Sequence, residues 1–278
     1  MSTTSTRRIT RVVRSRPVID DGDMRLYRAL PMPDRASIGP FVFFDHYRHV
    51  GPRGIGDEPH PHAGIEVISY LLEGGVEHRD SLGSRDRLSA GDAQWIRAGR
   101  GVVHAEQPLG GRHGLQLWTS LPSDRKLDEP AYHSWRAAEI PEATSAAGRV
   151  RVVAGTIDAM TGPMVLARPT TLAIAHLQPG ASLALAVDPE AELAIYVMDG
   201  AIDTGDGTSI EAGGLASLSA GSSVALSAAG GRRADVAVFG GVPIDEPILF
   251  SGPFVMDSAE RLAQARRDYA SGRMGRLA

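Results

Sequence analysis

The chain has 278 residues, of which 42% are hydrophobic, and a formal net charge of -4. This length can supply two domains of ordinary size with buried cores, and the weak negative charge provides no general attraction to nucleic-acid phosphates or anionic lipids. The sequence contains no cysteine, which excludes disulfides, thiolate metal sites and cysteine nucleophiles and leaves His, Asp and Glu as the strong metal ligands.

The start of the chain does not have the pattern of a secretory signal. Residues 1–16 carry several arginines, but no apolar run of signal-peptide length follows them, and nowhere do 18 apolar residues occur together. A mitochondrial transit peptide is the minor alternative, although the segment lacks a clear amphipathic helical period. We therefore expect a soluble cytoplasmic protein with no membrane or direct nucleic-acid partner.

Short predicted strands separated by Gly- and Pro-rich turns fill the first half of the chain. A continuous apolar run at residues 41–44 is typical of a strand covered on both faces. Residues 73–75, Glu-Gly-Gly, are predicted to form the turn of a hairpin. Further strands are predicted at residues 8–16, 24–30, 65–72, 76–80, 93–97, 102–106 and 115–121. This pattern predicts an all-β barrel or sandwich.

The second half repeats the first weakly. Residues 193–200 resemble residues 67–75, and residues 210–213 resemble residues 88–91. Strand-like segments resume near residue 150 and continue in a series rich in Gly, Ala and Ser. Two copies of one barrel are the simplest explanation of this repeat.

A connector with a polar middle, residues 123–145, separates the two copies. We place the first barrel at residues 1–135 and the second at residues 136–278, with a short C-terminal helix at 257–271. The helix is predicted from residues at helical spacing and from a start that resembles a capping box, with Asp257 as the N-cap.

Two pairs of candidate metal ligands stand out, His60-x-His62 and His104-x-Glu106. Side chains two apart on a strand point to the same face, so each pair offers two donors in one direction. Three imidazoles and a carboxylate that converge inside a small barrel would form a metal site. Such a set leaves one or two positions open, which suits Fe(II) and accommodates Mn, Co, Ni or Cu, whereas structural zinc is closed by four protein ligands.

The fourth ligand is ambiguous from spacing alone, because Glu66 competes with Glu106 and the residues leave the two nearly equal. The second copy has no such set, and His176 is the only histidine after residue 133. With Gly74 aligned on Gly200, the four ligand positions are occupied by Ala186, Asp188, Gly230 and Arg232. We therefore predict one metal per chain.

Other polar residues receive a structural interpretation. Trp95 and Trp118 are expected in the core. His78 is expected near the ligands, and Gln94 and Gln116 are expected as donors that orient the ligating groups. Surface or satisfied core positions are expected for His46, His49, His113, His133 and His176.

Several motifs closely resemble the pirin family of proteins with two cupin barrels. They are HPHAGIE at 60–66, YLLEG at 70–74, EHRDSL at 77–82, GDAQWI at 91–96, AGRG at 98–101, HAE at 104–106, GPFVM at 252–256 and DYASGRMGRL at 268–277. The resemblance extends over nearly the whole chain and is most specific in the N-terminal half. Ala63 and Ile65 stand where the family often has Arg and Phe, which bears on the substrate pocket and not on the proposed ligands.

The resemblance implies an all-β fold of two tandem cupin (jelly-roll) β-barrels with a C-terminal helix. It also implies that His60, His62, His104 and Glu106 bind the metal, and that Glu66 is an outer or structural carboxylate. One divalent transition metal per chain is expected, with Fe(II) first and Mn, Co, Ni, Cu or Zn as alternatives. The expected assembly is a monomer.

The leading hypothesis is a metal-dependent dioxygenase that cleaves a flavonol or similar enolic aromatic, as in the quercetin 2,3-dioxygenase activity attributed to bacterial pirins. A small aromatic substrate and O2 would then meet at the open metal positions, with Glu106 as the catalytic proton acceptor. The alternative is a non-enzymatic metal-binding pirin that acts through a protein partner in transcription or stress responses. A third hypothesis is a purely structural protein, for which removal of His60 and His62 would leave the metal content unchanged.

Overall fold

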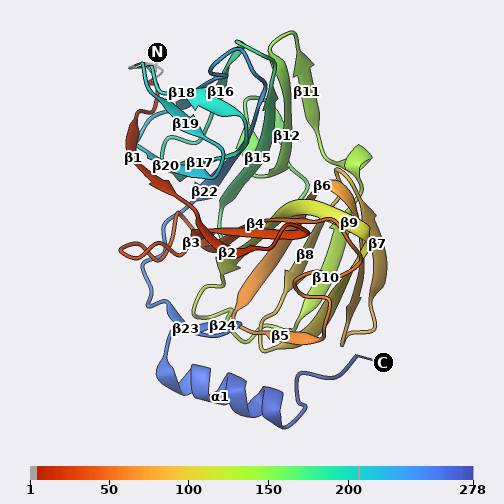
Figure 1. Ribbon diagram of the computed structural model, residues 1–278. Helices are drawn as coiled ribbons and strands as arrows, with labels where there is room; N and C mark the ends of the chain where they lie inside the picture. Colours follow the sequence, from red (N-terminus) through yellow and green to blue (C-terminus); the bar gives the residue numbers. More distant parts are fainter. Residues whose placement is uncertain (1–4, 206, 278) are drawn as a thin grey trace. The chain divides into compact units, whose positions relative to one another are not determined.

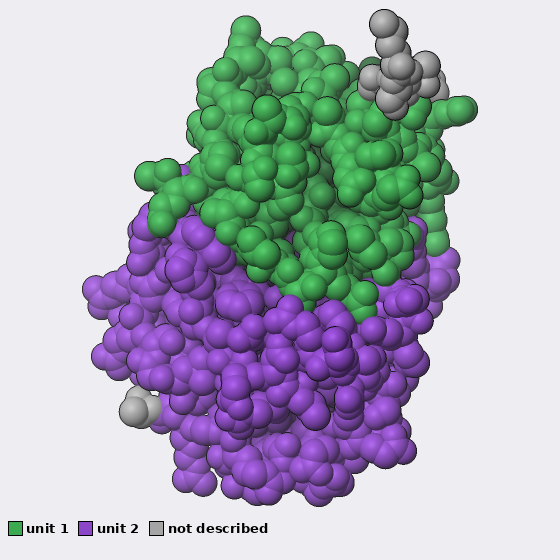
Figure 2. All heavy atoms as spheres, turned by 180° about the vertical axis from the view of Figure 1, so that it is seen from behind, with its two compact units in different colours: residues 1–16, 37–40, 138–243 green, residues 17–36, 41–137, 244–278 purple. Residues whose placement is uncertain are grey.

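The computed structural model describes residues 5–205 and 207–277 (Figure 1). The chain forms two compact units (Figure 2). Each is built mainly of antiparallel strands. The first barrel comprises residues 17–36, 41–137 and 244–278, and the second barrel comprises residues 37–40 and 138–243 with the N-terminal residues up to Arg16. The predicted all-β class, with two tandem cupin barrels and a short C-terminal helix, is confirmed.

The first barrel is built on a sheet with the strand order β10-β8-β6-β9-β4-β3-β2, while β5 pairs with β9 and β7 with β6. Its strands are β2 (Arg16–Asp20), β3 (Met24–Leu30), β4 (Phe41–His49), β5 (His60–His62), β6 (Ile65–Asp80), β7 (Arg85–Ser89), β8 (Ala93–Arg97), β9 (Val102–Ser120) and β10 (Ala131–Trp135), followed late in the chain by β23 (Leu249–Ser251) and β24 (Phe254–Met256). Buried apolar side chains such as Val67, Ile96 and Val102 form its core. These strands position the candidate ligands, because β5 and β9 carry both predicted pairs.

Two long bulged strands replace what the sequence suggested were separate short ones. The predicted hairpin turn at residues 73–75 is wrong, since β6 continues through it and pairs with β9 along its whole length. Gly74 has φ 76°, and a Cβ at this position would lie 2.2 Å from the carbonyl oxygen of Gly111 on β9. Glycine is therefore needed for a bulge and a close approach between strands, and not for a turn.

The second barrel has the strand order β1-β20-β17-β22-β15-β12-β11 in its main sheet, with β13 paired to β14, β16 to β21 and β18 to β19. Its strands are β1 (Ile9–Arg14), β11 (Glu142–Ser145), β12 (Gly148–Ala154), β13 (Thr156–Ile157), β14 (Met160–Thr161), β15 (Thr170–Leu177), β16 (Ser182–Ala186), β17 (Glu192–Asp199), β18 (Ala201–Asp203), β19 (Ser209–Glu211), β20 (Gly214–Leu218), β21 (Ser223–Ser227) and β22 (Ala234–Gly241). Aliphatic side chains, among them Val152, Ile195 and Val238, fill its interior.

The two units are not continuous in sequence, which differs from the linear division predicted at residue 135. Strand β1 pairs with β20, so the start of the chain belongs to the second barrel. The last residues, from Ile244 onward, return to the first barrel, where the backbone of Ala63 bridges to Phe254. Pairings between segments this distant in sequence carry no local signal that composition could reveal.

The C-terminal helix α1 (Ala259–Ala270) lies within the predicted range of residues 257–271. Its N-cap is Ser258, whose side chain accepts a hydrogen bond from the Arg261 N–H. Asp257, the predicted cap, instead accepts a hydrogen bond from the Arg261 guanidinium at 2.6 Å. Within the described residues, no helix is long and apolar enough to cross a membrane.

Candidate metal centre

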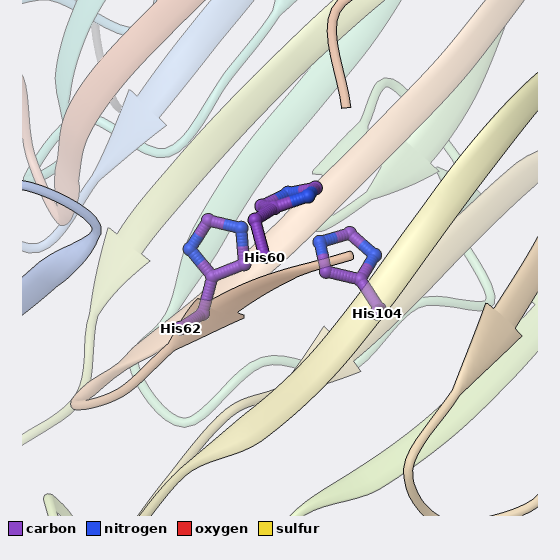
Figure 3. Close-up of side chains that lie close together, drawn as sticks. All are labelled: His60, His62 and His104. Atoms are coloured by element: carbon purple, nitrogen blue, oxygen red, sulfur yellow. The ribbon is translucent and has the colours of Figure 1, made fainter. Parts of the chain in front are cut away.

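Three histidines from two paired strands converge in the first barrel (Figure 3). His60 and His62 lie on β5, and His104 lies on β9 directly opposite His60 in the strand register. The ring centroids are separated by 5.0 Å for His60–His62, 4.3 Å for His60–His104 and 5.0 Å for His62–His104. One ring nitrogen from each histidine lies within 4.8 Å of those of the other two, a spacing that a single metal ion can bridge.

Backbone carbonyl groups orient two of these imidazoles. Nδ1 of His60 lies 2.9 Å from the carbonyl oxygen of Glu58, and Nδ1 of His62 lies 3.3 Å from that of Pro253. A carbonyl oxygen only accepts hydrogen bonds, so each Nδ1 must carry the proton and each Nε2 keeps its lone pair. Nε2 of His62 is buried and has no hydrogen-bond partner. Both rings are therefore held in the tautomer that binds a metal through Nε2.

Burial keeps the imidazoles of His62 and His104 neutral. The side chain of His104 is fully buried and that of His62 nearly so. Burial, reinforced by the neighbouring His60, lowers the pKa of His62 to about 3. Burial and the neighbouring histidines also lower the pKa of His104 well below its usual value. At neutral pH both rings offer a free electron pair and need release no proton to bind a metal.

The same pKa shifts predict that the metal-free protein loses stability in acid. An unfolded His62 takes up a proton near pH 6.5, but the folded one does so only near pH 3, so the unfolded state binds more protons in between and folding stability falls as the pH drops below 6.5. At pH 4.5 the loss due to His62 alone should be about 3 kcal/mol. Urea unfolding of the metal-free protein at several pH values measures it.

The His62→Asn variant provides the control for this titration. It cannot take up the proton at residue 62, so its stability should fall less steeply between pH 6.5 and 4.5 than that of the unsubstituted protein. Parallel pH profiles for the two proteins would show that His62 is not held neutral by folding.

Glu106 lies on β9 beside His104 but faces a different set of partners. Its Oε1 accepts a hydrogen bond from Gln94 Nε2 at 2.5 Å, and its Oε2 accepts one from Arg112 Nη1 at 2.8 Å. Oε1 lies 3.8 Å from Nδ1 of His104. The donor atoms of Glu106, His104 and His78 lie within 4.8 Å of one another, whereas Glu106 forms no such group with His60 and His62. Its assignment as the fourth metal ligand stays a prediction.

Glu66, the competing carboxylate, is engaged in bonds between strands. One oxygen accepts a hydrogen bond from Trp95 Nε1 on β8, and the other accepts one from Thr119 Oγ1 on β9, each at 3.0 Å. The side chain is buried. Both oxygens are thus used to tie β6 to its two neighbours, which is the arrangement of a structural carboxylate.

An aromatic pair stands beside the three histidines. Trp118 stacks on Phe43 with ring centroids 3.9 Å apart. Its ring also meets that of His62 edge to face, with the centroids 4.9 Å apart. Trp118 lies in the core, as predicted, and its indole Nε1 is buried without a partner. Gln94 donates to Glu106 and not to an imidazole.

His78, which was expected near the ligands, lies next to His104 with ring centroids 5.6 Å apart. Its other face stacks on Tyr132 at 4.2 Å, and its Nε2 lies 3.1 Å from Asp80 Oδ2. Nδ1 of His78 is buried without a hydrogen-bond partner. His78 therefore forms a group of possible metal donors with His104 and Glu106.

Sequence reasoning missed Arg112, a buried arginine on β9 that pairs with Glu106. An arginine within a strand is ordinarily expected on the solvent face. One signal was available: Arg112 is six residues after Glu106, an even spacing that places both side chains on the same face of a continuous strand. The bulges where β9 pairs with β6 interrupt the two-residue alternation of side chains along the strand.

Lys126, the only lysine of the chain, was also missed. Its Nζ is buried and donates to the carbonyl oxygens of Gly64 and Val255 at 2.8 and 3.0 Å and to Ser120 Oγ at 2.7 Å. Val255 is on β24, two residues after Pro253, whose carbonyl orients His62. Lys126 thus fixes the segment that sets the orientation of one candidate ligand.

Other histidines have the structural partners that were expected of them. Ring nitrogens of His46 and His113 lie 2.7 Å apart, and burial lowers the pKa of His46 to about 3. His176 Nδ1 lies 2.8 Å from Asp235 Oδ1. His133 is exposed and contacts Trp135.

Among residues 5–205 and 207–277, two groups of three residues could hold a metal ion, and both lie in the first barrel. Within these residues the second barrel offers no comparable cluster. Ala186 and Asp188, which align with the first ligand pair, line a cavity of about 410 Å³ in the second barrel. Arg232 donates to Glu211 at 3.5 Å. The two groups share His104, and one metal per chain stays a prediction.

Comparisons with known proteins match both halves of the chain. The family model described as "Pirin" covers residues 23–119, and the model described as "Pirin C-terminal cupin domain" covers residues 172–275.

The protein named "Pirin" from Homo sapiens is 33% identical over 277 residues, spanning 98% of this chain and 95% of the human one. The "Pirin-like protein" of Caulobacter vibrioides is also 33% identical and covers 96% of this chain and 99% of its own. Among solved structures, "Quercetin 2,3-dioxygenase from Acinetobacter baumannii" superimposes with a TM-score of 0.88 at 27% identity, covering 98% of this chain and 99% of that one. The chain belongs to the pirin family.

Proposed function

We propose that this protein is a metal-dependent dioxygenase that acts on a flavonol or a similar enolic aromatic substrate. The observation that supports it most is the convergence of three histidines, of which His62 and His104 are buried. In His60 and His62, Nδ1 is bound to a backbone carbonyl and Nε2 is free. The similarity to a structure titled quercetin 2,3-dioxygenase, over nearly the whole of both chains, supports the choice of reaction.

The donor set fits a divalent transition metal. His60, His62 and His104 would hold it, and imidazole ligands suit Fe(II) as well as Mn, Co, Ni, Cu or Zn. When bound, the metal supplies a Lewis acid with open positions at which the substrate oxygen and O2 are activated. Glu106 lies beside His104, and we propose that it accepts the proton of the substrate's enol group.

Aromatic side chains would position the substrate. Phe43 and Trp118 form a stacked pair against His62, and each is only 7% exposed. A planar aromatic molecule can pack against such an apolar wall, and the unpartnered Trp118 Nε1 is a donor that a substrate oxygen can satisfy. The wall also limits the access of water to the metal.

Turnover is tested with the metal-free protein reloaded with Fe(II) under anaerobic conditions and then mixed with a flavonol in air-saturated buffer. We expect loss of the flavonol absorbance together with uptake of about one O2 per flavonol, because a dioxygenase transfers both oxygen atoms. The His133→Ala variant, altered at an exposed histidine outside the cluster, should match the unsubstituted protein. No turnover with any first-row divalent metal would contradict the proposed reaction.

A non-enzymatic interaction protein is the second candidate. It is favoured by the second barrel, whose described residues show no donor group of three yet retain a cavity of about 410 Å³. Affinity capture with the metal-loaded and the metal-free protein distinguishes the two functions. A partner that binds only one of these forms, in a protein without turnover, would support the interaction role.

A further inference from the structure

We propose that the cavity of the second barrel is a separate ligand site, which binds a small aliphatic amine in its cationic form. The cavity has a volume of about 410 Å³, and the residues that line it all belong to the second barrel. This size is within the range of small-molecule sites in proteins. The inference goes beyond the proposed function, because this site takes no part in the chemistry at the three histidines.

The charged side chains that line the cavity are both acidic. Asp158 lies in the turn between β13 and β14, and Asp188 follows β16. None of the described residues that line the cavity is Lys, Arg or His. A cationic ligand is therefore attracted to the cavity, and an anionic ligand is repelled.

Both carboxylates are held in place through one oxygen. Asp158 Oδ1 accepts a hydrogen bond from the Ala186 N–H at 2.7 Å, and Asp188 Oδ1 accepts one from the Glu190 N–H at 3.0 Å. Asp158 has φ 53°, which few residues other than glycine adopt, and its own N–H donates to the Ala186 carbonyl oxygen at 3.0 Å. Among the described residues, no hydrogen bond reaches Oδ2 of either aspartate. Each Oδ2 can thus accept a hydrogen bond from an ammonium group.

Arg7 fixes the backbone beside Asp188 but is not part of the cavity lining. Its guanidinium is buried and donates to the carbonyl oxygens of Asp188 at 2.8 Å, Pro189 at 3.3 Å and Ser219 at 3.0 Å. Burial lowers the pKa of Arg7, and the nearby Asp188 carboxylate opposes this effect, so the charge of Asp188 is partly offset. Attraction of a cation therefore depends on Asp158 as well as on Asp188.

A buried hydroxyl provides independent evidence for a ligand. Thr171 lines the cavity and is only 5% exposed. It precedes Ala173 by two residues on β15, and Ala173 belongs to the apolar interior of the barrel, so both side chains face inward. Within the described part of the chain, the Thr171 side chain has no hydrogen-bond partner. Buried polar groups are ordinarily hydrogen-bonded, and a ligand in the cavity can provide the missing partner.

The apolar part of the wall favours an aliphatic ligand. Val187 and Ala191 line the cavity and belong to the interior cluster of aliphatic side chains. The described lining residues include no aromatic side chain, so the wall offers neither ring stacking nor a cation–π contact. Methylene groups can pack against this wall while an ammonium group stays at the carboxylates. The combination is typical of a site for a short alkylamine and not for an aromatic cation.

Calorimetric titration of the metal-free, full-length protein with 1,4-diaminobutane tests the site directly. We expect saturable binding of one diamine per chain, whereas 1,4-butanediol, which has the same length and no charge, should not bind measurably. Asp158→Asn and Asp188→Asn retain the oxygen that accepts the backbone hydrogen bond, and each should weaken diamine binding by about tenfold or more. Thr171→Val removes a neutral hydrogen bond and should weaken it by about two- to tenfold.

The control variant is Asp203→Asn, which removes the same charge at an exposed position of β18 that does not line the cavity. Its diamine affinity should equal that of the unsubstituted protein. Equal weakening by Asp203→Asn and the two cavity variants would overturn the inference by showing a general effect of surface charge.

Two further outcomes would overturn the inference. A diol that binds as tightly as the diamine would refute a cationic ligand, and no saturable heat from the diamine at millimolar concentration would refute the site itself. If Thr171→Val does not fold, the two Asn variants still decide, because they keep the backbone hydrogen bonds of the residues they replace. The titration uses metal-free protein and no flavonol, so its failure is distinct from a failure of the proposed dioxygenase.

Discussion

Replacement of His62 by alanine should weaken metal binding by about 100-fold or more, since even the loss of an outer-shell partner costs a metal site about 10- to 100-fold. His62 is buried, its Nδ1 is bound by the Pro253 carbonyl, and its Nε2 faces the other imidazoles without a partner of its own. With only His60 and His104 left, the site loses one of its three donors from the strand pair β5 and β9. Competition with a coloured chelator measures the affinity.

The matched control removes a histidine that the structure places elsewhere. His133→Ala makes the same chemical change at an exposed position of β10, and its metal affinity should equal that of the unsubstituted protein. Equal metal content in the His62→Ala variant and the unsubstituted protein would show that the three histidines do not form the metal site, as a purely structural protein requires.

Replacement of Lys126 by methionine should lower the free energy of unfolding by about 3–5 kcal/mol, because it leaves buried polar groups without a partner. The Nζ group of Lys126 bonds Gly64, Ser120 and Val255, which belong to three separate segments of the first barrel. Methionine fills a similar volume but can donate to none of these oxygens. Urea unfolding followed by tryptophan fluorescence measures the loss.

An exposed arginine provides the comparison for Lys126. Arg87 pairs with Glu77 through a side chain that is 72% exposed, so Arg87→Met removes the same charge at a cost below about 1 kcal/mol. The Lys126→Met variant should also bind metal more weakly, because β24 follows directly on Pro253, whose carbonyl orients His62. A loss of stability no larger than that of Arg87→Met would contradict the role assigned to Lys126.

The candidate ligands could be predicted because strand parity is a local property. His60 and His62 are two apart, and the sequence alone places them on the same face of one strand. The pairing of His60 with His104 connects residues 44 positions apart, and it could be inferred only from resemblance to a family. Spacing therefore predicts which side chains face the same way, but not which of them could share one ion.

The bulge at Gly74 shows why the strand boundaries were misjudged. A Glu-Gly-Gly sequence between apolar segments is typical of a hairpin turn, yet the same glycine also permits two strands to approach closely. Which of these applies depends on the backbone of Gly111, which lies on β9 far along the chain. The start of the chain joins the second unit for a similar reason, since the pairing of β1 with β20 depends on residues about 200 positions apart.

The role of Glu106 depended on residues that local patterns do not single out. Its spacing from His104 predicts a ligand, and the direction of its carboxylate is set by Arg112 and Gln94. Hydrogen bonds between side chains of different strands follow from the register, which the sequence specifies only through the whole fold. The chemistry of the donors was therefore more predictable than the partners that fix each side chain.

The most direct test of the metal centre is a crystal structure of the Fe(II)-loaded protein with anomalous diffraction recorded at the iron absorption edge. We predict one strong anomalous peak per chain, within about 2.0–2.2 Å of an Nε2 atom of each of His60, His62 and His104. A peak at any other position, or a fully loaded crystal with no peak between these three rings, would contradict the site on which the proposed function depends.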